Sequence, residues 1–218
     1  MQHRALLAVC SFALLHACDA ADQRDYLRAA DPKLTSAGDP RYDKAVRQVL
    51  ARGWRGDVVV RTVSLPPFEP EAVVGVLRKR DGYRAFSIRP SVQIWDEAGY
   101  GSTDPNKRVG DYSKVRPVFH DRPLPGSVAA RIAAVWRRVL SDKRNYGKDP
   151  SIYLDTSTFA FYVSFLHGER LAAHVTGWGR NTKQIILVTE ELLTYTTGKS
   201  DQPQLLRVLS TAERKVGI

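Results

Sequence analysis

Cysteine is nearly absent from this chain: Cys10 and Cys18 are the two cysteines among its 218 residues. No disulfide can therefore form in the sequence that follows Cys18, which excludes the small secreted domains that disulfides hold together. Stability has to come from an apolar core. About two hundred residues suffice for one, since a domain of that size buries roughly 70% of the surface of its unfolded chain.

Motifs that identify a reaction are missing too. No serine stands in a G-x-S-x-G pattern, neither H-E-x-x-H nor C-x-x-C occurs, and the stretch GYGSTDPNK lacks the spacing of a phosphate-binding loop. His167, Glu169 and His174 could hold zinc only if one hairpin brought all three together. The acidic stretch WDEAGYGSTDPN lacks the fixed alternation of a calcium loop. The sequence thus predicts no cofactor and no bound metal.

An apolar run, ALLAVCSFALL, extends from Ala5 to Leu15 and follows a positive charge at Arg4. About 20 apolar residues are needed to span a bilayer, whereas about 7 to 15 after a charged start are typical of a secretory signal peptide. We therefore expect residues 1–17 to be an export signal rather than a membrane span.

The end of this run resembles the bacterial lipoprotein box, through Leu15, Ala17 and Cys18, with His16 where a small or apolar residue is usual. The alternative is ordinary signal peptidase cleavage, for which small residues at Cys18 and Ala20 give a partial match. The resemblance implies that Cys18 is lipidated and begins the mature chain. It places the protein in the cell envelope, anchored to a membrane on the periplasmic side, and leaves the choice of inner or outer membrane open.

Three segments are expected along the chain. After the signal peptide, residues 18–38 carry the lipidated cysteine and a polar run that cannot bury enough apolar surface to offset its ordering entropy, which predicts a flexible tether. Residues 39–218 contain no internal repeat and no low-complexity block. They are expected to form a single globular domain.

The first half of that domain begins with a helix pattern and continues with strand patterns. Asp39 suits the N-cap of a helix, Pro40 its first turn and Gly53 its C-terminal end. Four short antiparallel strands are then expected over residues 57–96, with Asp81-Gly82 as a hairpin turn. The stretch VRPVFH suggests one more strand.

The second half of the domain also combines helix patterns with strand patterns. Ser127 is expected to cap a helix whose apolar stripe includes Trp136, and a second hairpin is expected to turn near His167. Two further helices are expected, one ending near Gly198 and one following Asp201. The order of these elements predicts an α+β fold, an antiparallel sheet built from hairpins with three to four amphipathic helices packed on it.

Part of the domain resembles a group of uncharacterised bacterial proteins. The shared features are a Leu-Pro before the helix with Val135-Trp136 and Leu140, then Leu154-Asp155 before an aromatic strand, then Gly177-Trp178. The resemblance covers residues 123–197 and implies no activity.

The chain is basic, with a formal net charge of +10. Such a charge attracts polyanions, and outside the cytoplasm these are lipid headgroups, envelope polymers and acidic proteins rather than nucleic acid. On one helix, Arg131 and Arg138 are seven residues apart and share a flank, while Arg137 is expected to point away from the core. The three could form a basic binding surface with Arg28, Arg41, Lys44 and Arg47, or they could simply keep the surface solvated.

Candidate catalytic residues are few. His120 beside Asp121 could act as a base with its orienting carboxylate, with Ser127 nearby in the sequence, and Asp155 could act as an acid if buried beside Tyr153 or Tyr162. No sequence motif places these residues in one catalytic site. The sequence therefore favours a non-enzymatic binding domain for an envelope protein or an anionic polymer, and the alternative is a hydrolase acting on cell-wall or envelope substrates.

Overall fold

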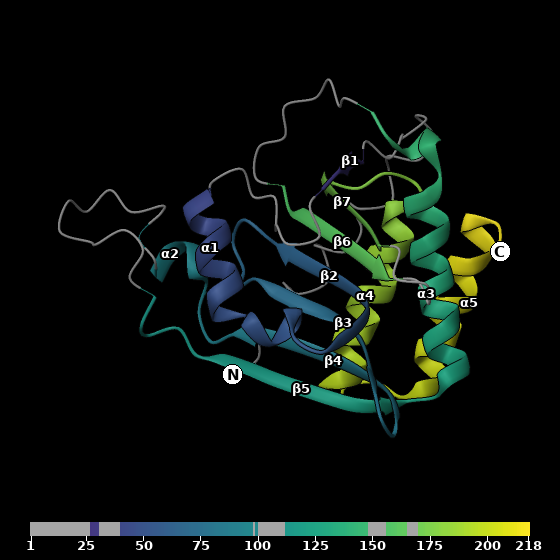
Figure 1. The fold of residues 1–218 in the computed structure, drawn as a ribbon, viewed down its shortest axis with the longest axis horizontal. Helices are drawn as coiled ribbons and strands as arrows, with labels where there is room; N and C mark the ends of the chain where they lie inside the picture. Colours follow the sequence, from purple (N-terminus) through teal and green to yellow (C-terminus); the bar gives the residue numbers. More distant parts are fainter. Residues whose placement is uncertain (1–26, 31–39, 98, 100–111, 148–155, 165–169) are drawn as a thin grey trace, which may run out of the picture.

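The fold is a seven-stranded antiparallel sheet with helices on both faces, as Figure 1 shows. The computed structural model describes residues 27–30, 40–97, 99, 112–147, 156–164 and 170–218. The strand order is β1-β7-β6-β2-β3-β4-β5. The strands are β1 (Arg28–Ala29), β2 (Asp57–Leu65), β3 (Ala72–Lys79), β4 (Gly82–Pro90), β5 (Pro117–Leu124), β6 (Thr158–Ser164) and β7 (Arg170–Thr176).

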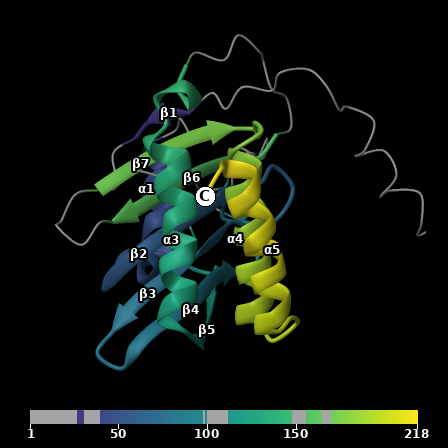
Figure 2. The same cartoon turned by 90° about the vertical axis from the view of Figure 1, so that its right-hand side faces the viewer.

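Helices form a layer on each side of this sheet (Figures 1 and 2). On one face α3 and α4 contact the strands, and α5 packs on α3 and α4. The other face carries two helices and a short 3-10 helix, η2. The helical elements are α1 (Pro40–Val49), η2 (Ala51–Trp54), α2 (Ile94–Glu97), α3 (Gly126–Ser141), η3 (Lys143–Asn145), α4 (Thr182–Thr196) and α5 (Gln202–Val216). The predicted α+β class is confirmed.

Two apolar cores result, one on each face of the sheet. The larger includes Trp136, Leu192 and Leu209 from α3, α4 and α5, and the smaller includes Val46 from α1 and Phe86 from β4. Gly75 of β3 permits close packing in the sheet, because a Cβ there would lie 2.2 Å from the carbonyl oxygen of Val60. A larger residue at this position would push neighbouring strands apart.

Polar pairs fix α4 on the sheet. The hydroxyls of Thr189 and Thr62 lie 3.0 Å apart, and those of Thr196 and Ser87 lie 2.7 Å apart, all buried. Thr189 and Thr196 are seven residues apart, which puts both on the same side of the helix. These two hydrogen bonds give four buried hydroxyls the partners that water would otherwise supply. They therefore favour one position of α4 along the strands.

Most predicted elements are found, and two details are wrong. Trp136 lies on the buried stripe of α3 as expected, but Ser127 does not cap this helix, which begins at Gly126 after Pro125 without a side-chain cap. The expected fourth strand is instead α2. Its first amides, those of Ile94 and Trp95, donate to the buried carboxylate of Glu71 at 2.8 and 3.1 Å.

The predicted tether is also wrong in part. Arg28–Ala29 forms β1 at the edge of the sheet, and Leu27 is buried in the larger core. Its amide donates to the carbonyl of Asn145 at 2.8 Å, and the amide of Gly147 donates to the carbonyl of Leu27 at 3.3 Å. Leu27, which lies within the largely polar run of residues 18–38, therefore belongs to the folded domain.

The predicted signal peptide and Cys18 lie outside the described residues. Within the part of the chain that the structure describes, no helix is both long enough and apolar enough to cross a membrane.

Candidate functional site

Arg131 of α3 is tied to α5. Its Nε and Nη2 donate to the two carboxylate oxygens of Glu213 at 2.8 and 2.7 Å, and Nη2 also donates to the hydroxyl of Ser210 at 2.9 Å. These hydrogen bonds hold the pKa of Glu213 below its ordinary value. The side chain of Arg131 is therefore only 36% exposed and is paired with α5, which packs on this flank.

The other two predicted arginines of α3 lie near its C-terminal end. Arg138 is exposed, and its Nε donates to the carbonyl of Val216 at the end of α5, at 3.1 Å. Arg137 lines a cleft between α3 and the sheet, and together with Arg138 it also lines an open hollow past the end of α3. Arg137 and Arg138 thus share a surface, whereas Arg131 is held by α5.

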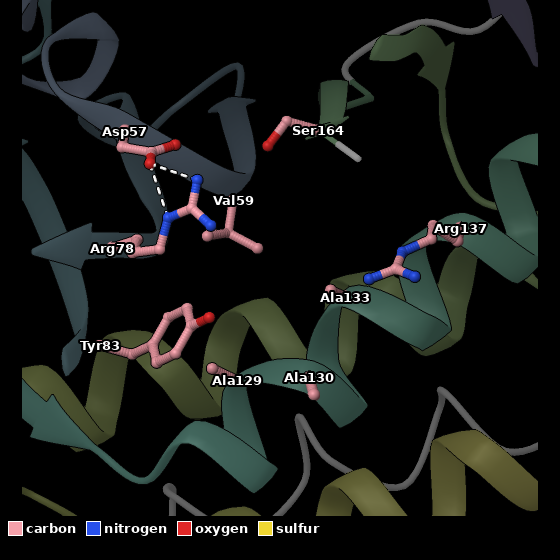
Figure 3. Close-up of a pocket in the computed structure, with 9 residues that line it drawn as sticks. All are labelled: Asp57, Val59, Arg78, Tyr83, Ala129, Ala130, Ala133, Arg137 and Ser164. Carbon is pink, nitrogen blue, oxygen red and sulfur yellow. Dashed lines mark hydrogen bonds and ion pairs between the residues drawn. The ribbon is translucent and has the colours of Figure 1, made fainter. Parts of the chain in front are cut away.

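We call this cavity the α3 cleft, and Figure 3 shows its lining. It has a volume of about 120 Å³ and lies between α3 and the ends of four strands. Small side chains on α3 leave the room for it. Its lining residues are Asp57, Val59, Arg78, Tyr83, Ala129, Ala130, Ala133, Arg137 and Ser164.

Two arginines come to the cleft from opposite walls. Arg78 of β3 is held by Asp57 of β2, whose Oδ2 accepts from Nε at 2.7 Å and lies 2.6 Å from Nη2. Arg137 approaches from α3 on the other side (Figure 3). The hydroxyl of Ser164 donates to the carbonyl of Val58 at 2.8 Å. The lining therefore presents guanidinium donors above an apolar floor of alanines.

Past the C-terminal end of α3 lies an open hollow of about 420 Å³. Its one acid, Asp142, accepts from the backbone amide of Arg144 at 3.0 Å and from its Nη2 at 2.6 Å. These bonds lower the pKa of Asp142 to about 2. Its lining residues are Arg137, Arg138, Ser141, Asp142, Lys143 and Arg144. Arg137 is shared with the α3 cleft.

The predicted pair of His120 and Asp121 is not brought together. Both lie on β5, where successive side chains point to opposite faces of the sheet. Asp121 accepts from Arg84 Nε at 2.7 Å and from Lys79 Nζ at 3.3 Å, and the bonds from Arg84 hold its pKa below its ordinary value. His120 is exposed. Asp121 is thus part of a network of charges and is not positioned to orient His120.

The remaining candidates do not form a site in the described structure. Ser127 is exposed in the first turn of α3, and Asp155, His167 and Glu169 lie outside the described residues. His174 lies on β7, where burial lowers its pKa. Across the described ranges no group of three or more histidine, cysteine, aspartate or glutamate side chains could hold a metal ion.

Several residues of the cleft were missed by sequence reasoning, notably Arg78 and Tyr83. They come from neighbouring strands, and the contact with α3 depends on tertiary packing. Lys143 and Arg144, which follow α3 directly, were visible as adjacent cations in the sequence.

Comparisons with family models, curated proteins and solved structures found no match for this chain.

Proposed function

We propose that this chain is a lipoprotein of the bacterial cell envelope, anchored through Cys18, whose domain binds an anionic group of an envelope polymer in the α3 cleft. The observation that carries the binding proposal is the pair of arginines, Arg78 and Arg137, on opposite walls of the cleft. Asp57 is the one acid among the described residues that line the cleft, beside these two arginines. An anion is the complementary ligand.

The cleft limits the size of the bound group. Its volume of about 120 Å³ is small, although it is larger than the roughly 10–15 Å³ that a single water needs. One carboxylate or phosphate with a few carbon atoms fits that space, and a whole polymer unit does not. The proposed ligand therefore inserts an end group or a side group, while the rest of the polymer stays outside.

The walls of the cleft combine cations with apolar side chains. Val59 and the alanines of α3 form an apolar floor, beside which the attraction between unlike charges is stronger than in bulk water, while the Arg78 side chain stays 45% exposed. Asp57 holds the guanidinium of Arg78 in one orientation, so less side-chain entropy is lost when a ligand binds. A guanidinium also matches the oxygens of a carboxylate or a phosphate with paired donors.

A binding role agrees better with the described residues than the hydrolase alternative does. Nucleophilic catalysis needs a base within hydrogen-bond reach of its nucleophile and a third group to orient it. His120 and Asp121 lie on opposite faces of β5. No described observation favours a hydrolase, so we propose binding without reaction.

The first test removes one charge from the cleft. Arg78→Gln should raise the Kd for inorganic phosphate about tenfold or more, because a hydrogen bond to a charged group contributes about 1.5–3 kcal/mol. Isothermal titration of the domain with phosphate and, separately, with acetate measures this. The matched control is Arg89→Gln, since Arg89 is paired with Glu69 at 2.8 Å and is as exposed as Arg78, at 42% against 45%.

The second test fills the cleft without changing its charge. Ala130 is exposed on α3 and lines the cleft, so Ala130→Leu should fold normally and block the ligand. Ser127→Leu adds similar bulk one turn earlier, outside the lining, and serves as the control. If phosphate and acetate bind Arg78→Gln and Ala130→Leu as tightly as the parent, the cleft is not the binding site.

A further inference from the structure

The first described residues of the chain lie beside a basic part of the surface. Leu27 lies nine residues after Cys18 and is bonded to Asn145, the last residue of η3. Lys143 and Arg144 belong to the same 3-10 turn. A lipid anchor at Cys18 would therefore hold this part of the domain close to the membrane.

Further cations lie at the same end of the helical layer. Asn181, which precedes α4, donates through Nδ2 to Oδ1 of Asn145 at 3.0 Å, and this contact places the start of α4 beside η3. Figures 1 and 2 show the end of α3, the start of α4 and β1 at one end of the molecule. We call this the anchor-side end, with Arg138, Lys143, Arg144, Trp178, Arg180 and Lys183 as its defining residues.

Among the described residues, the acids close to this end are bonded to arginines. Asp142 is bonded to Arg144, and Glu213 in the last turns of α5 is bonded to Arg131. The C-terminus of α3 itself carries a partial charge of only about −0.5. Within the described part of the chain, the five cations that define the end therefore exceed what the helix dipole and Asp142 can balance.

Exposed apolar side chains accompany these cations. Trp178 is 45% exposed just before α4, and Ile218 is 56% exposed just after Val216, the residue that Arg138 contacts. Tryptophan is enriched where membranes meet water, because its ring is apolar and its N–H is polar. Cations and an exposed tryptophan at the end where the chain emerges are what a lipid surface would attract.

We propose that the anchor-side end lies on the anionic lipid surface of the membrane in which Cys18 is inserted. This inference rests on the lipid anchor of the proposed function, and it does not depend on ligand binding in the α3 cleft. A lysine or arginine close to an anionic membrane is attracted to the lipid headgroups. The five cations thus select one orientation of the domain, with β1 and η3 toward the bilayer.

Amine labelling of the full chain, acylated at Cys18 and reconstituted in vesicles, tests this orientation. On vesicles that contain phosphatidylglycerol, labelling of Lys143 and Lys183 should fall at least fivefold relative to pure phosphatidylcholine vesicles at low salt. The protection should disappear at high salt, where charges are screened. Lys199 is the internal control, because it lies at the opposite end of α4, where Arg122 donates to the carbonyls of Tyr195 and Ser200.

A charge-matched pair of variants separates orientation from overall charge. Arg144→Gln with Arg180→Gln should reduce the protection of Lys183, whereas Arg55→Gln with Arg207→Gln removes the same charge elsewhere and should not. Equal labelling of Lys143 on both vesicle types would overturn the docking surface. A full chain that is isolated from its expression host and sediments with neither vesicle type would instead show that Cys18 carries no lipid there, which removes the premise from the proposed function.

Discussion

At the scale of single residues, Glu71 joins two elements that are separate in the sequence. It is fully buried, and its carboxylate accepts from the hydroxyl of Tyr42 in α1 at 2.5 Å and from two amides of α2. Buried donors without an acceptor cost about 1–3 kcal/mol each. The carboxylate therefore acts as the distant cap of α2.

Replacing Glu71 by Ala should remove the buried acceptor that these three donors share. We expect a loss of about 3–5 kcal/mol and a fall in Tm of roughly 10 °C, measured by thermal unfolding. Glu69→Ala removes an exposed partner of Arg89 and should change Tm by 2 °C or less, since such pairs contribute about 0–1 kcal/mol. Similar melting of both variants would show that Glu71 does not hold α2 in place.

Asp142 gives a pH dependence that can be assigned to one residue. Hydrogen bonds from Arg144 lower its pKa from 3.8 to about 2. A carboxyl whose pKa is lower in the folded state stabilises the fold above its unfolded pKa, and this contribution is lost as the pH falls through the folded pKa. The contribution of Asp142 should therefore disappear between about pH 4 and pH 2.

The variant Asp142→Asn isolates this effect. The free energy of unfolding of the parent should exceed that of the variant at pH 5, and the two should converge as the pH approaches 2. Denaturant unfolding at several pH values measures the difference. A gap that stays constant over this range would mean that Asp142 does not titrate with a lowered pKa.

At the scale of elements, the apolar stripe of α3 carries much of the larger core. Trp136 is fully buried between the sheet and the other helices, and its Nε1 has no hydrogen-bond partner among the described residues. Trp136→Ala should therefore cost about 3–5 kcal/mol, because it leaves a large cavity. Trp136→Phe keeps most of the apolar contact and loses no hydrogen bond, so it should cost clearly less. Equal Tm values for parent and Trp136→Ala would place this side chain outside the core.

The same helix shows what periodicity can and cannot predict. Spacing of apolar residues identifies the buried stripe, because it depends on the geometry of one helix. The partners of Arg131 and Arg137 depend on where α5 and the strand ends pack, which local patterns do not contain. For the same reason α2 was expected as a strand, since its cap is supplied by Glu71, 23 residues away from Ile94. Of the α3 cleft, only Arg137 was a candidate from the sequence.

At the scale of the whole molecule, the fold brings cations from separate segments together. The net charge of +10 could be read from the sequence, but the proximity of the cations of η3 to those at the start of α4 follows from the fold, which places these two elements side by side. For the sheet, the hairpin turns along the sequence predicted that it is antiparallel. The position of β6 beside β2 was not predictable, because the two strands are far apart in the chain.

If the proposed lipid anchor at Cys18 is present, the burial of Leu27 also sets how far the domain can move from the membrane. An extended chain covers about 3.3–3.6 Å per residue, so the nine steps from Cys18 to Leu27 reach about 30 Å at most. This is close to the thickness of the hydrocarbon core of one bilayer. With Cys18 as the anchor, Leu27 would stay within about 30 Å of the membrane surface. The domain would therefore bind only those parts of a polymer that lie close to the membrane.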